Sequence, residues 1–285
     1  MESLDLFGKL PEGCISHIIS FTSPRDACRS SAVCSIFLSA SESDSVWERF
    51  LPPDYQDVLA GSVSPPVRFS SKKELFFRLC DPVLIDDNKM SFSIEKRTGR
   101  KCYMLSARKL WITWGDTPMY WKWNSLPESR FPEVAELLSV CWLEISGKID
   151  AHLLSPKTTY KAYLVIKFGE EAYGLDFPHA ETSVKLGGHA SNNVALLQRN
   201  ETQRFHRWTA LYQLNMWRRA QAVSNRADAQ VPQSRSDGWM EIEMGEFFID
   251  EGEEGDIEMR LMEVKGGHWK SGLIVEGIEM RPVCE

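Results

Sequence analysis

The sequence predicts an α+β protein in two domains, a small N-terminal three-helix module followed by an antiparallel β-sandwich. Over the first 80 residues, apolar side chains recur every three or four positions, which is the spacing of one helix face. Beyond that point they alternate with polar side chains, as in half-buried strands, and turns rich in Gly, Pro and Asp separate the segments. The change of period places the domain boundary near residue 80.

Apolar stripes and capping residues predict the helices. A first helix is indicated by four apolar side chains that follow Pro11: Cys14, Ile15, Ile18 and Ile19. Ser23 can cap a second helix, because Pro24 fits the first helical position, where no N–H is needed. Two further stripes lie at Ala32, Val33, Ile36, Phe37 and Ala40 and at Val46, Trp47, Phe50 and Leu51. Ser71 and Glu74 form a capping box that opens one more short helix.

The second domain is predicted to consist of strands joined by turns. The alternating segments lie at 90–94, 110–114, 160–168, 240–244, 257–261 and 274–280. Residues 218–237 are polar and lack apolar periodicity, so they are predicted to form a mobile surface loop between two strands. Such a loop would be open to trypsin at Arg218, Arg219, Arg226 and Arg235.

Composition narrows the function classes. The 33 Lys and Arg are outnumbered by 40 Asp and Glu, which argues against binding to nucleic acid or to a membrane surface, since both favour clustered positive charge. No run of about 18 apolar residues could span a bilayer, and the N-terminal residues lack a secretory signal. The seven cysteines contain no C-x-x-C pair, which indicates free thiols and a location in the cytoplasm or nucleus.

No pattern in the sequence predicts catalysis, a cofactor or a metal site. The six His residues have no metal-ligand spacing, and the segment Gly169 to Gly174 lacks the Lys that a P-loop needs. The acidic run from Asp250 to Glu258 lacks the closing Glu of an EF-hand, and no Gly-x-Ser-x-Gly is present. The sequence therefore predicts a non-catalytic binding protein.

Ten side chains near the N-terminus are spaced as in the F-box, and residues 6–52 resemble that family. The matching positions include an opening Leu-Pro, a Pro that starts the second helix, a Val-Cys before the third and a closing Trp. In that family the module docks on the Skp adaptor, which links it to a cullin and a RING subunit in SCF ubiquitin ligases. The resemblance implies that adaptor binding involves Leu10, Pro11, Ile15, Ile18, Ile19, Pro24, Val33, Cys34, Phe37 and Trp47.

Packing arguments agree with this resemblance. Three short helices bury too little apolar surface to be well stabilised alone. An apolar face that includes Leu10, Pro11, Ile15, Ile19 and Val33 is expected to stay partly exposed and to mark a partner surface. The alternative interpretation is that these residues pack against the β domain.

The second domain resembles the phloem-protein-2 or Nictaba-like lectin domain of plants over residues 100–283. The similarity is carried by the blocks at 103–115, 120–123, 140–147, 238–247, 255–258 and 266–278. It implies a jelly-roll-like sandwich and, for lectin members, binding of N-acetylglucosamine oligosaccharides or N-glycan cores. The expected organisation is an F-box at 1–52, a helical or extended connector at 53–99 and a lectin-like domain at 100–285.

The same resemblance implies a carbohydrate site at Trp114, Trp121, Trp123 and Glu258, with Trp123 equally well placed for the core. An indole stacks on the apolar face of a sugar, and a carboxylate accepts hydrogen bonds from sugar hydroxyls. A second acidic position of the lectins is Lys265 here, which weakens the similarity at the site. Four more tryptophans are predicted to lie in the core of this domain: Trp111, Trp142, Trp239 and Trp269.

Three functional hypotheses follow. In the first, the chain is the substrate-recognition subunit of an SCF-type ligase and binds glycans or glycoprotein targets through its lectin-like domain. In the second, that domain has lost sugar binding and recognises a protein directly, an option that Lys265 favours. In the third, the chain is a cytosolic carbohydrate-binding lectin without a ligase role.

Overall fold

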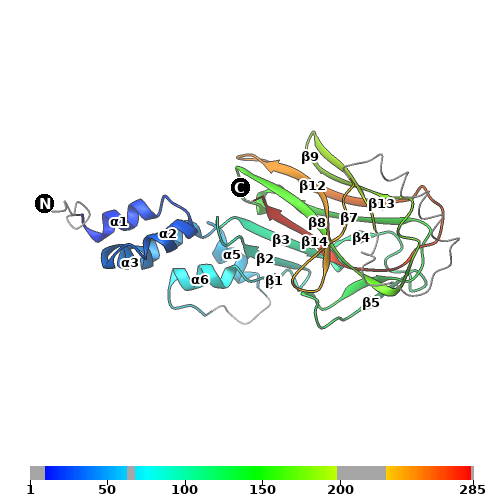
Figure 1. Ribbon diagram of the computed structural model, residues 1–285, viewed down its shortest axis with the longest axis horizontal. Coiled ribbons are helices and arrows are strands. Elements are labelled where there is room, and N and C mark those ends of the chain that lie inside the picture. The colour runs from blue at the N-terminus through cyan, green and yellow to red at the C-terminus, as the bar shows by residue number, and fades with distance from the viewer. Residues whose placement is uncertain (1–9, 63–67, 198–228, 284–285) are drawn as a thin grey trace, which may run out of the picture.

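The computed structural model describes residues 10–62, 68–197 and 229–283, with helices at one end and a β-sandwich at the other (Figure 1). This arrangement confirms the predicted fold class. The helices are α1 (Glu12–Ile19), α2 (Pro24–Ser30), α3 (Ser35–Glu42), α4 (Asp44–Phe50), α5 (Tyr55–Ala60) and α6 (Lys72–Leu79).

Local capping explains where two of these helices begin. The Ser23 hydroxyl accepts the Asp26 N–H at 3.1 Å, and Pro24 occupies the first position of α2. The Ser71 hydroxyl accepts the Glu74 N–H at 3.1 Å at the start of α6, as predicted. The Glu74 carboxylate turns back to the Ser70 N–H rather than to Ser71, so the capping box extends one residue further.

The helical module is completed by α6, which lies in the predicted connector. Trp47 is 1% exposed, and its ring centroid lies 5.6 Å from that of Phe50, 5.2 Å from Phe76 and 5.4 Å from Phe77. Two of these partners belong to α6, so the helices within residues 12–50 do not complete their core by themselves. This agrees with the small apolar area that they can bury.

The helices and the sandwich are in direct contact at Gly99 and Lys101. Gly99 has φ +74°, and a Cβ there would lie 2.5 Å from the Phe50 carbonyl oxygen, so only glycine fits. The Lys101 ammonium lies 3.0 Å from the Asp54 carboxylate, with the Lys101 side chain only 7% exposed. A buried cation with a partner across the boundary fixes the two parts against each other.

The sandwich consists of two antiparallel sheets among the described residues. The nine-stranded sheet contains β1 (Val83–Ile85), β2 (Met90–Ile94), β3 (Lys101–Ser106), β14 (Ser271–Pro282), β8 (Thr158–Tyr173), β12 (Met240–Ile249) and β11 (Gln233–Ser234), with β5 (Trp121–Asn124) and β6 (Val134–Leu137) attached through β14. The five-stranded sheet runs β10 (His189–Ala195), β9 (Ala180–Leu186), β13 (Asp256–Glu263), β7 (Leu143–Asp150), β4 (Trp111–Ile112). Because β1 and β2 belong to the first sheet, the connector is part of the sandwich as well as of the helical module.

The alternation of side chains fixes which face of each strand is buried. On β13, Ile257, Met259 and Leu261 are fully buried, while Glu258 and Arg260 point outward. Thr182 of the five-stranded sheet donates to the Met244 carbonyl of the other sheet at 2.9 Å. The core therefore lies between the two sheets.

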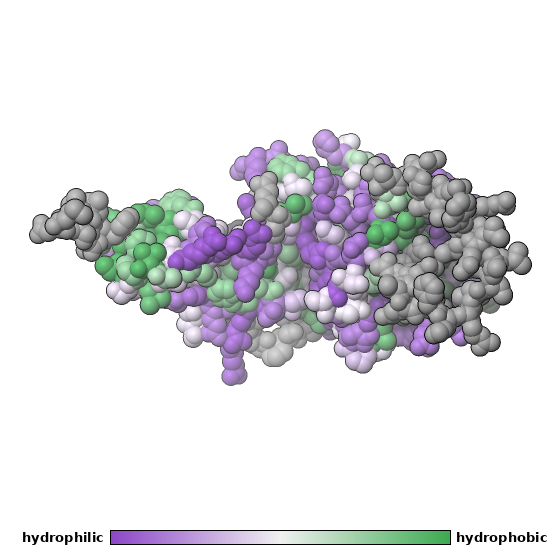
Figure 2. Space-filling model, viewed as in Figure 1, coloured by the Kyte–Doolittle hydropathy of each residue, from purple (hydrophilic) through white to green (hydrophobic). Residues whose placement is uncertain are grey.

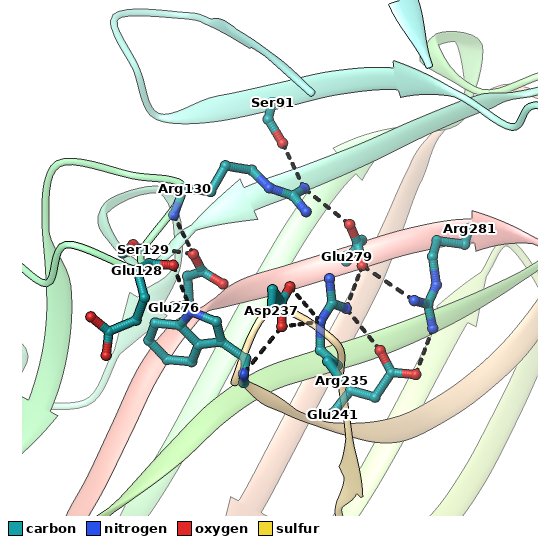
Figure 3. A network of polar contacts seen from close by, with 11 residues as sticks. Ser91, Glu128, Ser129, Arg130, Arg235, Asp237, Glu241, Glu276, Glu279 and Arg281 are labelled. Atoms are coloured by element: carbon teal, nitrogen blue, oxygen red, sulfur yellow. Dashed lines mark hydrogen bonds and ion pairs between the residues drawn. The ribbon is translucent and has the colours of Figure 1, made fainter. Parts of the chain in front are cut away.

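A polar network covers part of the outer face of the nine-stranded sheet (Figure 3). Glu279 on β14 accepts from Arg130 at 3.0 Å and from Arg235 at 2.7 Å, and its side chain is only 8% exposed. Arg235 also contacts Asp237 and Glu241. Each of these charges contacts one of opposite sign, which allows them to be buried.

This network corrects part of the predicted mobile loop at 218–237. Residues 218–228 lie outside the described residues. Residues 229–237 are instead fixed to the sandwich by pairing and burial. β11 pairs with β12, Gln230 forms a bridge with Ala195, and the Arg235 side chain is 12% exposed. The sequence pattern did not indicate these contacts, because one of the partners of Arg235 is Glu279, 44 positions away.

In the described parts of the chain, no helix is long and apolar enough to cross a membrane. The same residues contain no group of three or more His, Cys, Asp or Glu side chains that could hold a metal. The six described cysteines are free thiols.

Candidate functional site

The helical module exposes a set of large apolar side chains. Leu10 is 39% exposed, Ile18 56% and Val33 68%, and Phe21 and Leu38 are also exposed. We call these five residues the helical apolar surface. Figure 2 shows hydrophobic residues gathered on this end of the molecule. An exposed apolar set of this kind on so small a module marks a partner surface.

The ten residues predicted to bind the adaptor divide into two groups. Leu10, Pro11, Ile18, Val33 and Cys34 are exposed, and Phe37 is half-buried. The other four are buried, which corrects the expectation that they face a partner: Ile15, Ile19, Pro24 and Trp47. Ile15 and Ile19 lie on α1, Pro24 begins α2 and Trp47 lies on α4, so these side chains shape the module rather than contact another protein.

The predicted sugar-binding tryptophans surround a turn after β4. Trp114 is 44% exposed, has φ +59° and lies beside Tyr120, with ring centroids 5.2 Å apart. The Trp121 indole N–H donates to the Thr113 carbonyl at 3.1 Å, and that of Trp123 donates to the Gly115 carbonyl at 3.0 Å. Two indoles thus hold the backbone that presents a third.

Trp121 itself has no free face for a sugar. It is 2% exposed and belongs to the main core, which corrects its assignment as a stacking residue. Trp123 is half-buried, and the Arg108 guanidinium covers its ring at 3.6 Å. Of the three tryptophans, only Trp114 presents an open ring.

We expect Trp121→Ala to destabilise the β domain by about 3 kcal/mol, because it removes a buried aromatic ring and leaves a cavity. The Thr113 carbonyl would also lose its donor. Urea denaturation followed by tryptophan fluorescence measures the change. Trp114→Ala is the matched control, since its exposed ring contributes little to folding, and equal stability of both variants would contradict the burial argument.

Glu258 lies away from this turn. It points outward from β13, as its position between Ile257 and Met259 predicts, and pairs with Lys148 at 2.5 Å. This bond and the Lys148 charge lower the pKa of the Glu258 carboxyl. Glu258 is opposite Lys148 on β7, whereas Trp114 follows the other end of that strand, about 17 Å further along. The structure does not bring Glu258 and Trp114 into one groove.

Three of the four tryptophans predicted to be core residues are exposed instead. Trp111 is 58% exposed, Trp142 45% and Trp269 54%, whereas Trp239 is buried as predicted. Alternation could have placed two of them correctly: Trp111 precedes the buried Ile112, and Trp142 precedes the buried Leu143. The general rule that large aromatics fill cores misled the prediction.

The fold and these surfaces define a two-part binding protein, with a helical docking module joined to a sandwich that displays aromatic side chains. Comparison with known families agrees: residues 7–52 match the F-box-like family, and residues 100–282 match Phloem protein 2. The chain belongs to the F-box proteins that carry a phloem protein 2 domain.

Curated relatives from Arabidopsis thaliana share both parts. F-box protein At2g02240 is 48% identical over 277 residues, covering 97% of this chain and 80% of that protein. F-box protein PP2-B10 is 45% identical over 280 residues, covering 97% and 94%. F-box protein PP2-B15 is 45% identical and covers 96% of each chain.

Proposed function

We propose that this protein is the substrate-recognition subunit of an SCF-type E3 ubiquitin ligase and acts in the cytoplasm or nucleus. In this role the helical apolar surface binds the Skp adaptor, which links the chain to a cullin and a RING subunit. The observation that carries the proposal is the exposure of Leu10, Ile18 and Val33 on a module that matches the F-box family. The chain acts as an adaptor, and the transfer chemistry belongs to its partners.

The physical basis is the removal of apolar side chains from water. Each large apolar side chain that becomes fully buried contributes roughly 1.5–3 kcal/mol. Five such residues on one small module are enough to anchor a specific interface, in which a few side chains carry most of the binding energy.

We expect Val33→Glu to weaken binding of the Skp adaptor more than about tenfold, because a carboxylate would be buried in an apolar interface. Val33 is 68% exposed, so the change leaves the module folded. Co-purification of the full chain with the adaptor measures the effect. Phe248→Glu is the matched control, since Phe248 is half-exposed on the sandwich. Unchanged adaptor binding by Val33→Glu would contradict the proposed docking surface.

The β domain supplies target recognition in this proposal, and its targets are glycans or glycoproteins. Exposed tryptophans on the sandwich support this ligand class, since an indole stacks on a sugar ring. A glycan array probed with the full chain bound to its adaptor is the test. The second candidate, direct recognition of a protein, is favoured by the burial of Trp121 and by Lys265, and absence of glycan binding would select it.

A further inference from the structure

The outer face of the five-stranded sheet carries two exposed tryptophans at its β4–β7 edge. Trp111 on β4 lies opposite Ser146 on β7, and Trp142 precedes β7 by one residue. Both rings point away from the core, because Ile112, Leu143 and the rest of the inward set are buried. The two positions are separated by about 14 Å along the sheet, which is four residues of strand.

Glu144 lies between the two rings on the same face. The Trp142 indole N–H donates to the Glu144 carboxylate at 3.0 Å, which fixes both side chains. The Thr113 N–H donates to the Glu144 carbonyl at 3.1 Å, so Glu144 is the next outward position after Ser146 in the pairing of β7 with β4. We call Trp111, Trp142 and Glu144 the two-tryptophan surface.

The other carboxylates nearby on this sheet are already paired. Glu258 contacts Lys148 and Arg260, and Glu181 contacts Lys265. Glu144 has no ion pair among the residues that the structure describes, and one of its carboxylate oxygens is left to accept hydrogen bonds from a ligand. The surface therefore combines two apolar rings with an acceptor. The nearest cation, Arg260 on β13 opposite Ser146, lies beside the Glu258 carboxylate, which balances its charge.

We propose that the two-tryptophan surface is the glycan-binding site of this protein and takes a neutral oligosaccharide, with one sugar ring on each indole. This proposal rests on the proposed recognition of glycans and gives it a location different from the one expected around Trp121. Glu144 accepts hydrogen bonds from hydroxyl groups of the sugar that lies between the rings. A single ring cannot reach both indoles, so the site favours oligomers over monosaccharides.

The chemistry of the surface favours a sugar over a peptide. Apolar peptide side chains need a recess that surrounds them, whereas these two rings stand on the open face of a sheet. A sugar ring needs only one flat apolar contact and hydrogen-bond acceptors at its rim. The Trp142–Glu144 bond also holds that ring in place before binding, which lowers the entropic cost.

The test is titration of the full chain, bound to its adaptor, with an N-acetylglucosamine trimer, followed by calorimetry. Trp111→Ala and Trp142→Ala should each reduce the affinity about thirtyfold. Trp111→Phe should restore most of it, since a smaller ring still stacks. Glu144→Gln should weaken binding severalfold, because it removes the charge but keeps the shape. Phe248→Ala is the matched control, since that ring is 50% exposed and lies on β12 of the other sheet.

Two results would overturn the proposal. The first is normal trimer binding by Trp111→Ala and Trp142→Ala together with its loss in Trp114→Ala, which would place the site at the turn after β4. The second is an absence of glycan binding by the unmodified chain, which would leave protein recognition as the function of the sandwich. Adaptor co-purification is measured on the same sample, so either failure is distinguished from a failure of the ligase role.

Discussion

Replacing Trp47 with Ala is expected to unfold the helical module and to abolish adaptor binding. The ring is 1% exposed, and its N–H donates to the Ser41 carbonyl at 2.7 Å. It contacts Phe50 in its own helix and Phe76 and Phe77 in α6, so it joins the F-box helices to the connector. Loss of a buried Trp costs about 3–5 kcal/mol, and a module this small has little stability in reserve.

Hydrogen exchange separates loss of the module from general unfolding. In Trp47→Ala the amides of α1 to α4 should exchange rapidly, while those of β8 and β14 stay protected. Val33→Ala is the control for stability, because a side chain that is 68% exposed contributes little to folding. Retained protection of α1 in Trp47→Ala would show that the aromatic contacts are not what holds the module.

In the helical module, neighbouring residues in the sequence determine where helices begin and which faces are apolar. Caps and apolar spacing predict the start of α2 and the stripe on α1, because both depend on neighbouring residues in one helix. The same spacing cannot tell which apolar side chains face a partner. Ile15 and Ile18 belong to one predicted face, but only Ile15 is buried, since burial depends on where α3 and α4 lie.

The sandwich shows a different limit. Alternation along β4 and β7 contained the correct orientation of Trp111 and Trp142, and a general preference of tryptophan for cores obscured it. Trp114 does not follow the alternation, because its positive φ reverses the chain after β4. The similarity to lectins identified Trp121 as a site residue, whereas the structure makes it a support for the turn that carries Trp114.

Contacts distant in sequence could not be predicted at all. Arg130 and Glu279 are 149 positions apart, and neither has a local pattern that suggests a partner. The network that they form depends on a loop folding over β14, which only the tertiary structure reveals (Figure 3). This network leads to the prediction with the clearest dependence on pH.

Replacing Glu279 with Gln is expected to destabilise the protein by about 3 kcal/mol at neutral pH, because removing one member of a buried charged group leaves the others uncompensated. Glu279 contacts Arg130 and Arg235 directly and lies 3.6 Å from Arg281. Urea denaturation of the full chain measures the difference. Glu258→Gln is the control, since its more exposed ion pair is worth about 0–1 kcal/mol.

The difference in unfolding free energy between the native protein and Glu279→Gln should become smaller in acid. Burial alone would raise the pKa of the Glu279 carboxyl, but the charges of Arg130 and Arg235 outweigh it and hold the pKa below its usual value. A carboxyl with a depressed pKa stabilises the fold fully above its unfolded pKa of about 4.3 and loses this contribution as the pH falls toward the folded pKa. The difference in unfolding free energy should therefore begin to decrease below about pH 5.

Glu276, in the same network, tests the direction in which the stability difference changes with pH. Burial raises the pKa of its carboxyl, even though it accepts the Arg130 N–H at 2.6 Å. A raised pKa means that the folded state binds the proton more tightly, so acid favours the native protein relative to Glu276→Gln. The two stability differences should thus change in opposite directions between pH 7 and pH 4. If both shrink together in acid, the arginines do not distinguish the two carboxylates, and the network is not organised around Glu279.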